Sequence, residues 1–167
     1  MSGVDQEATT RVAWIGLGAN LGDLEVALAR LRHHLTFNDV RIERSSSEIM
    51  TAPVGVLEQP DFRNQVVVLE APIDLPPEQW LALCKQAERA AGRKPTYKWG
   101  PRYADADILL LGEHGELRVD TPALRVPHAE LINRPFFCRL LAEIDPELTH
   151  PDGWLFTDRM GAESPTR

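Results

Sequence analysis

Cysteine is scarce in this sequence, with only two among 167 residues. Cys84 and Cys138 each lie within an apolar pattern, and they match neither a disulfide framework nor a metal-site spacing. We therefore expect the protein to reside in the reducing cytoplasm. Long apolar runs are also missing, because none approaches the roughly 18 residues that a membrane span needs. Residues 1–10 lack the apolar core of a signal peptide. No membrane partner is predicted.

Positive charge is in short supply as well, since 18 lysines and arginines stand against 25 aspartates and glutamates and the net charge is −7. An acidic protein repels the phosphate backbone, so a general nucleic-acid binder is disfavoured. A GxxxxGK[ST] phosphate loop is absent, and any phosphate must be held by side chains. Gly16, Gly18 and Gly22 miss the spacing of the dinucleotide-binding fingerprint, and we interpret them as a tight strand-to-helix turn.

Hydrophobic periodicity predicts one domain over residues 11–157, with flexible tails at 1–10 and 158–167. Asp23 is expected to cap the first helix and Gly92 to end the second. The expected elements, in chain order, are a strand at 12–17, a helix at 24–35, strands at 41–50 and 65–70, a helix from Pro77 to Gly92, and a strand that ends at Leu111.

This order of elements predicts an α+β fold with a ferredoxin-like βαββαβ core, in which helices pack on an antiparallel sheet. The residues from Gly112 onward are expected to form a C-terminal extension. It should contain a hairpin, a short helix near residues 129–133 and a closing segment.

The segment Trp99–Leu111, WGPRYADADILLL, contains two acids in an apolar strand. Alternation places Asp105 and Asp107 on one face and Ala106 and Ile108 on the other, with the two acidic Cα atoms roughly 6.5 Å apart. Buried carboxylates this close repel each other, and Mg²⁺ that also binds substrate phosphates relieves the repulsion. The alternative is an edge strand with two solvated acids.

A basic stretch without any acid leads into that strand. Cations beside paired carboxylates suit a metal-bound polyphosphate, which needs positive charge for its oxygens and carboxylates for its metals. Gly92 and Gly100 bracket the stretch, as a closing lid requires. Its basic residues are Arg89, Arg93, Lys94, Lys98 and Arg102.

Two further segments contain polar and aromatic residues that suit a flat heterocycle. After the proline-rich loop at residues 51–61, Phe62 is placed to stack on a ring and Asn64 to pair with its edge. His128, Arg134 and Phe136 suit a phosphate beside a stacked ring. The alternatives are an ordinary loop, a structural histidine, a surface ion pair and core phenylalanines.

Together these segments resemble the 6-hydroxymethyl-7,8-dihydropterin pyrophosphokinase family of folate biosynthesis. The most specific signal is WGPR followed by the D-x-D strand. The five matching segments, in the family's order, are GLGANLGD at 16–23, TAPVGVLEQPDFRNQVV at 51–67, E-x-x-x-GR at 88–93, WGPRYADADILL at 99–110 and PHAELINRPFF at 127–137.

The resemblance implies transfer of the β,γ-diphosphate of ATP to the hydroxymethyl group of the pterin, with release of AMP. ATP would be the co-substrate, and two Mg²⁺ ions would bind Asp105 and Asp107. These two residues, with Arg93 and Arg102, would be catalytic. The implied ATP-binding residues are Glu88, Arg93, Trp99, Arg102, Ile108, His128 and Arg134. The implied pterin-binding residues are Thr51, Ala52, Val54, Phe62, Asn64 and Phe136.

We expect a monomer whose partners are ATP and the hydroxymethyl dihydropterin. Two other functions stay open. A catalytically impaired relative would bind nucleotide or pterin only, because Pro95 and Thr96 stand where some family members have basic residues. An RNA-binding ferredoxin-like module is disfavoured, because the strand at 65–70 offers no stacking aromatic.

Overall fold

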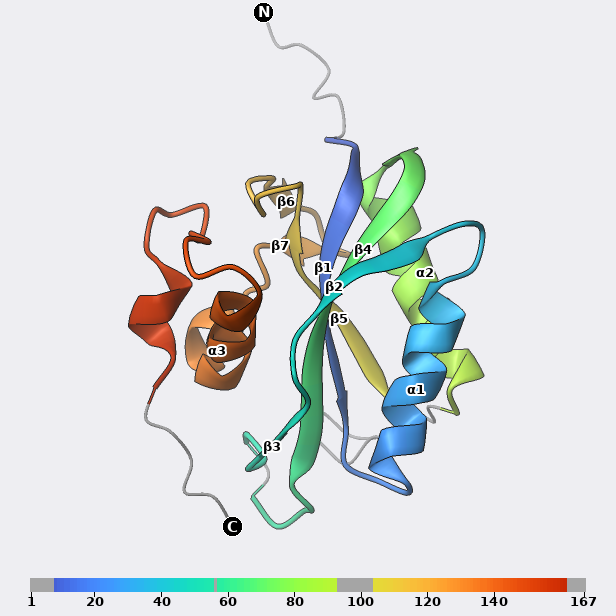
Figure 1. The fold of residues 1–167 in the computed structure, drawn as a ribbon, viewed down its shortest axis with the longest axis vertical. Coiled ribbons are helices and arrows are strands. Elements are labelled where there is room, and N and C mark those ends of the chain that lie inside the picture. Colours follow the sequence, from blue (N-terminus) through green and yellow to red (C-terminus); the bar gives the residue numbers. More distant parts are fainter. Residues whose placement is uncertain (1–7, 56, 93–103, 162–167) are drawn as a thin grey trace, which may run out of the picture.

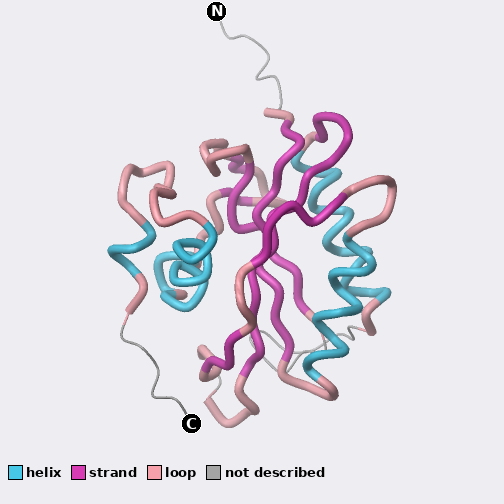
Figure 2. Tube along the Cα trace, viewed as in Figure 1, coloured by secondary structure: helices cyan, strands magenta, loops and turns pink. Residues whose placement is uncertain are grey.

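The computed structural model describes residues 8–55, 57–92 and 104–161. Its main sheet is antiparallel, with the strand order β2-β4-β1-β5 and with β3 also paired to β4. Helices lie on both sides of these strands (Figures 1 and 2). The five strands are β1 (Thr10–Ala19), β2 (Arg41–Ser45), β3 (Ile49–Thr51), β4 (Phe62–Leu75) and β5 (Asp105–Leu111). The helices are α1 (Leu24–Leu35), α2 (Pro77–Ala90) and α3 (Pro135–Ile144). The prediction of an α+β, ferredoxin-like fold is confirmed.

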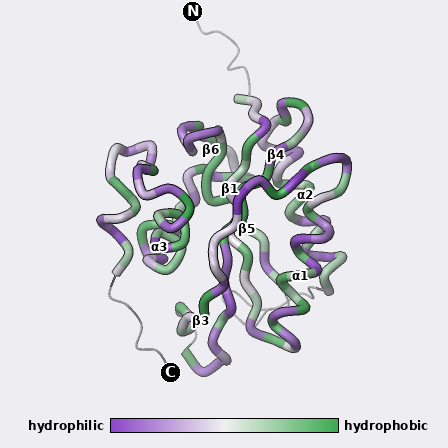
Figure 3. The backbone as a smooth tube through the Cα atoms, viewed as in Figure 1, coloured by the Kyte–Doolittle hydropathy of each residue, from purple (hydrophilic) through white to green (hydrophobic). Residues whose placement is uncertain are grey.

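Strand β1 is buried on both faces because helices cover both sides of the sheet. Ile15 and Leu17 belong to a core cluster with residues of α1 and α2. Trp14 points the other way, into a second cluster that contains α3 residues such as Phe137 and Leu141. The hydrophobic stretches of the strands therefore lie between two helical layers (Figure 3).

The first two helices begin and end at the predicted signals. The Asp23 carboxylate accepts a hydrogen bond from the backbone N–H of Val26 at 3.2 Å and so caps α1. Pro77 is the first residue of α2, where a missing N–H costs nothing. Gly92, with φ of +96°, follows that helix in the left-handed conformation that glycine favours. No helix within the described residues is long and apolar enough to cross a membrane.

Two strand predictions are corrected. The strand expected at 41–50 is interrupted at Ser46–Glu48 and forms β2 and β3. Strand β4 extends well beyond the expected residues 65–70. Its first part carries the polar residues Arg63, Asn64 and Gln65, which hydrogen-bond in the fold to the side chains of Glu48 and Thr51 and to the backbone carbonyl of Ser46. A hydrophobic pattern cannot detect such a strand.

The C-terminal extension contains the expected hairpin, formed by β6 (Val119–Asp120) and β7 (Arg125–Val126). A single 3-10 turn, η1 (Leu131–Asn133), lies where a short helix was predicted. Helix α3 was not predicted, because Pro135 was interpreted only as part of a functional motif although it opens the helix. A second 3-10 turn, η2 (Phe156–Arg159), continues the fold past residue 157.

Candidate functional site

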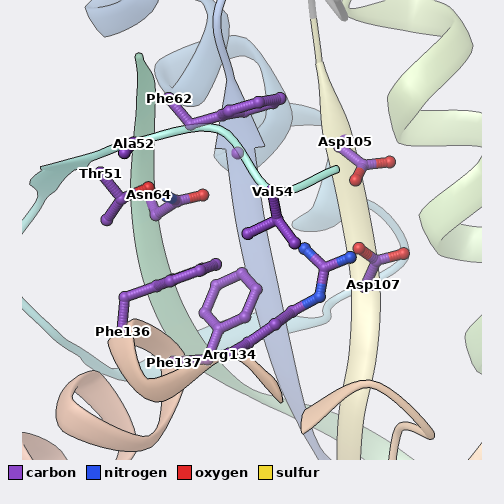
Figure 4. Close-up of a pocket in the computed structure, with 11 residues that line it drawn as sticks. Thr51, Ala52, Val54, Phe62, Asn64, Asp105, Asp107, Arg134, Phe136 and Phe137 are labelled. Carbon is purple, nitrogen blue, oxygen red and sulfur yellow. Dashed lines mark hydrogen bonds between the residues drawn. The ribbon is translucent and has the colours of Figure 1, made fainter. Parts of the chain in front are cut away.

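A cleft opens between α3 and the ends of β1, β4 and β5, beside the loop after β3 (Figure 4). It brings together all of the predicted pterin-binding residues, both predicted metal ligands and one predicted phosphate-binding arginine. Its lining residues are Gly18, Thr51, Ala52, Val54, Phe62, Asn64, Asp105, Asp107, Arg134, Phe136 and Phe137.

Two half-buried phenylalanines form the apolar part of the cleft. Phe62 opens β4, and Phe136 lies in the first turn of α3. Their rings lie on opposite sides of the cleft, with Asn64 between them in the view (Figure 4). Phe137 supports Phe136, since their ring centroids are 4.7 Å apart. A flat ring between these two side chains would contact both of them.

Asn64 is 4% exposed and has a fixed orientation. Its Nδ2 donates a hydrogen bond of 2.6 Å to the hydroxyl of Thr51. The register of β3 on β4 places the two side chains together, because Thr51 pairs with Phe62 and Ile49 pairs with Asn64. The Asn64 amide is therefore held in one orientation, in which its donor and acceptor can pair with the polar edge of a flat ligand.

The sequence interpretation of two glycines was wrong, since Gly16 and Gly18 lie inside β1 and only Gly22 belongs to the turn. A Cβ at Gly16 would lie 2.8 Å from the ring of Phe137, and one at Gly18 would lie 2.7 Å from Oδ1 of Asn64. These glycines therefore let the cleft side chains lie against the sheet. Glycine in the interior of a strand often marks a place where another group approaches the backbone closely, so the sequence did contain a signal for this packing.

Asp105 and Asp107 project from the same face of β5 toward the cleft (Figure 4). Ala106 and Ile108 face the opposite core cluster, as alternation predicted. Strand β5 is an edge strand among the described residues, yet both acids are partly buried, so the fully solvated alternative is not supported. Burial and the neighbouring Asp105 carboxylate raise the pKa of Asp107 well above its ordinary value.

Three described residues predicted to contact nucleotide, Glu88, Ile108 and His128, do not line the cleft. Ile108 and Glu88 are 3% and 2% exposed and lie on the α2 side of β5. The Glu88 carboxylate accepts a hydrogen bond of 2.9 Å from the backbone N–H of Ala106, between the two aspartates. Its other oxygen is 3.5 Å from Nζ of Lys85. Glu88 therefore holds the strand that carries the acids.

Arg134 and His128 provide donors near the acids. The Nε of Arg134 is buried and has no hydrogen-bond partner among the described residues, and its guanidinium reaches toward Asp107 (Figure 4). The Nδ1 of His128 accepts a hydrogen bond from the backbone N–H of Glu130 at 3.1 Å, so the ring proton resides on Nε2. Burial and Arg134 lower the pKa of His128, which favours the neutral ring.

The remaining predicted residues, Arg93, Trp99 and Arg102, lie outside the described residues, as does most of the basic stretch. Their roles stay predictions.

Comparison with known proteins identifies the family. The model of the 7,8-dihydro-6-hydroxymethylpterin-pyrophosphokinase (HPPK) family matches residues 14–146. This chain belongs to the HPPK family. The Aquifex aeolicus 2-amino-4-hydroxy-6-hydroxymethyldihydropteridine pyrophosphokinase is 37% identical over 142 residues, which are 83% of this chain and 82% of that protein. The corresponding Bacillus subtilis protein is 36% identical over 154 residues, or 90% of this chain and 87% of the relative.

Solved structures agree with the HPPK assignment at the level of the fold. A Plasmodium falciparum HPPK-DHPS structure with pteroate superposes with a TM-score of 0.69 at 14% identity. The match covers 93% of this chain and 42% of that longer chain. The family match and the named relatives identify this chain as a pterin pyrophosphokinase of folate biosynthesis. An RNA-binding module is no longer needed to explain it.

Proposed function

We propose that the chain transfers the β,γ-diphosphate of ATP to 6-hydroxymethyl-7,8-dihydropterin, with Mg²⁺ bound at Asp105 and Asp107. The pterin hydroxyl oxygen would attack the β-phosphorus of ATP as the bond from that phosphorus to the α,β-bridging oxygen breaks. The hydroxyl proton would pass to solvent, and AMP would leave. The observation that carries this proposal is one cleft with an aromatic, amide-bearing end and an acidic end.

The aromatic end supports binding of the pterin. Phe62 and Phe136 would stack on the two faces of the ring. The Asn64 amide, held by Thr51 at 2.6 Å, would pair with the polar edge of the ring. Ala52 and Val54 lie beside this ring site and would supply backbone and apolar contacts. The hydroxymethyl group would then point toward the acids.

The acidic end suits magnesium by the chemistry of its donors. Asp105 and Asp107 are hard carboxylate ligands, and burial together with the neighbouring Asp105 carboxylate raises the pKa of Asp107. Among the described residues no group of three His, Cys, Asp or Glu side chains could hold a metal. Two carboxylates fit Mg²⁺, which takes its other ligands from water and phosphate. Two bound ions would supply neutralisation of the phosphate charge.

Cationic and polar groups would position the triphosphate. The unpartnered Nε of Arg134 offers a buried donor, and the Nε2–H of neutral His128 offers another. Arg93 and Arg102 are proposed to clamp the phosphates and to stabilise charge that develops in the transition state. Glu88, Ile108 and Trp99 are proposed on the nucleotide side. In this transfer the protein would position the two substrates and neutralise charge, and it would form no covalent bond with either of them.

Assay of AMP release from ATP and the hydroxymethyl dihydropterin, with and without Mg²⁺, tests the proposal. We expect Mg²⁺-dependent AMP release that Asp105→Asn or Asp107→Asn reduces by about 10³-fold or more. The control is Asp120→Asn, since the Asp120 side chain is 80% exposed on the β6–β7 hairpin. Pterin and nucleotide binding without AMP release would favour the impaired relative.

We further propose a monomer in the cytoplasm. Cys84 and Cys138 are both buried and free, which supports a reducing setting. Light scattering of the purified chain would test the oligomeric state.

A further inference from the structure

A network of side chains lies behind the proposed pterin site, on the opposite face of the sheet. Arg63 stands between Phe62 and Asn64 on β4, so alternation directs it away from the cleft and toward α1. Its Nε donates to Glu48 Oε1 at 2.7 Å, and its guanidinium lies 3.4 Å from Glu25 of α1. The side chains of Arg63 and Glu48 are only 27% and 25% exposed.

The network continues from Glu48 back to β4. The second oxygen of Glu48 lies 3.8 Å from Arg32 of α1. Arg32 donates a hydrogen bond of 2.8 Å to the side-chain oxygen of Gln65. Gln65 in turn donates to the backbone carbonyl of Ser46 at 3.0 Å. Two residues of β4 are thus joined through side chains to the segment Ser46–Glu48.

That segment is the place where the sheet needs such support. The ladder between β2 and β3 is interrupted at Ser46–Glu48, where Ser46 still bonds to Val66 of β4 through its N–H and its hydroxyl, and β3 itself has only three residues in register with β4. A slip of one residue would move every side chain of a strand to the other face. The correct register aligns Thr51 with Phe62, and the Thr51 hydroxyl then holds the Asn64 amide.

We propose that Arg63 is a positioning residue for the pterin site, acting through its ion pair with Glu48 to fix the register of β3 on the first residues of β4. The inference rests on the proposed pterin-binding role of Phe62 and Asn64. Arg63 itself touches no substrate. Its loss frees β3 and the start of β4 to shift, which disturbs the ring site while the carboxylates on β5 stay in place.

A second arginine–glutamate pair, farther along β4, provides a control. Arg41 of β2 pairs with Glu70 of β4 at 2.7 Å, the distance of the Arg63–Glu48 bond. This pair lies beyond the strand break and toward the other end of β4. Arg41→Ala deletes one ion pair and Arg63→Ala deletes two, but only the pairs of Arg63 border the cleft residues.

The experiment measures affinity for hydroxymethyl dihydropterin and, separately, for a non-hydrolysable ATP analogue with Mg²⁺, by calorimetry. For Arg63→Ala we expect the pterin Kd to rise about tenfold, in the range of measured couplings between contacting residues, and the nucleotide Kd to stay within about twofold. Arg41→Ala should leave both values unchanged. Arg63→Lys, which keeps a cation beside Glu48 and Glu25, should retain most of the pterin affinity. Glu48→Gln keeps the shape of the side chain and provides the same test if Arg63→Ala does not fold.

Three outcomes would overturn the inference in distinguishable ways. If Arg63→Ala leaves the pterin Kd unchanged while Phe62→Ala raises it, the pterin site stands and the register role falls. If pterin and nucleotide affinity fall together with the melting temperature, Arg63 is merely a stability residue. If neither Phe62→Ala nor Asn64→Ala weakens pterin binding, the proposed ring site is itself misplaced, and the role of Arg63 falls with it.

Discussion

Replacing Asp107 with asparagine should make the ligand-free protein more stable while it destroys the enzyme. In the free protein this carboxylate is partly buried beside Asp105, and Glu88 adds a further negative charge nearby. Two unit charges about 4 Å apart repel by about 4 kcal/mol at an effective dielectric constant of 20. Arg134 offsets part of this repulsion. We therefore expect Asp107→Asn to raise the free energy of unfolding by about 1–3 kcal/mol at pH 8.

The sign of the pH dependence follows from the raised pKa of Asp107. The folded protein holds this proton more tightly than the unfolded chain, whose ordinary value is 3.8. Wild-type stability is therefore lost, relative to the variant, as the pH rises from about 4 through the folded pKa. The variant should gain little near pH 4 and progressively more as the pH rises to 8. A gain of 1–3 kcal/mol corresponds to roughly 3–10 °C in melting temperature for a domain of this size.

Thermal melts of both proteins between pH 4.5 and 8, with and without Mg²⁺ and an ATP analogue, provide the assay. The ligands should stabilise the wild type and have much less effect on the variant. Asp120→Asn, an exposed carboxylate, should change neither series. A variant that melts at or below the wild-type temperature throughout, with no dependence on pH, would refute the reasoning.

Three further predictions address single residues. Glu88→Ala should lower the free energy of unfolding by about 1–3 kcal/mol in urea titrations, because the N–H of Ala106 loses its acceptor; Glu88→Gln keeps an acceptor oxygen and should cost less. Gly18→Ala should weaken pterin binding about tenfold in calorimetry, because the new Cβ lies 2.7 Å from Oδ1 of Asn64 and displaces that amide. Arg102→Ala should lower kcat about 10²-fold or more, with little change in KM, in steady-state assays of AMP release; a change confined to KM would contradict a transition-state role.

The parts of the site that could be predicted from the sequence depend on short-range geometry. Asp105 and Asp107 share a face because a strand alternates, and the structure shows this. Phe62 and Asn64 share a face of β4 for the same reason. The convergence of these strands with Phe136 followed from the family resemblance rather than from any local pattern.

The parts that were missed depend on residues distant in sequence. The first residues of β4 are polar, and their place in the sheet becomes clear only when partners such as Glu48 and Thr51 are brought to them. The role of Gly18 requires knowledge of the Asn64 amide on the neighbouring strand. Helix α3 begins with a proline inside a motif that suggested a loop, and its buried face became evident only against β1 and β4.

The hydrogen bond from Ala106 to Glu88 has a consequence for the behaviour of the protein in a crowded cell. An unprotected edge strand offers a row of free amides to any passing extended chain, which is a route to aggregation. Here the outward amide between the two aspartates is already occupied by a buried carboxylate. Negative charge on both sides of it discourages the close approach of another backbone. The two aspartates proposed to bind Mg²⁺, together with Glu88, therefore also protect this edge of the sheet against pairing with another strand.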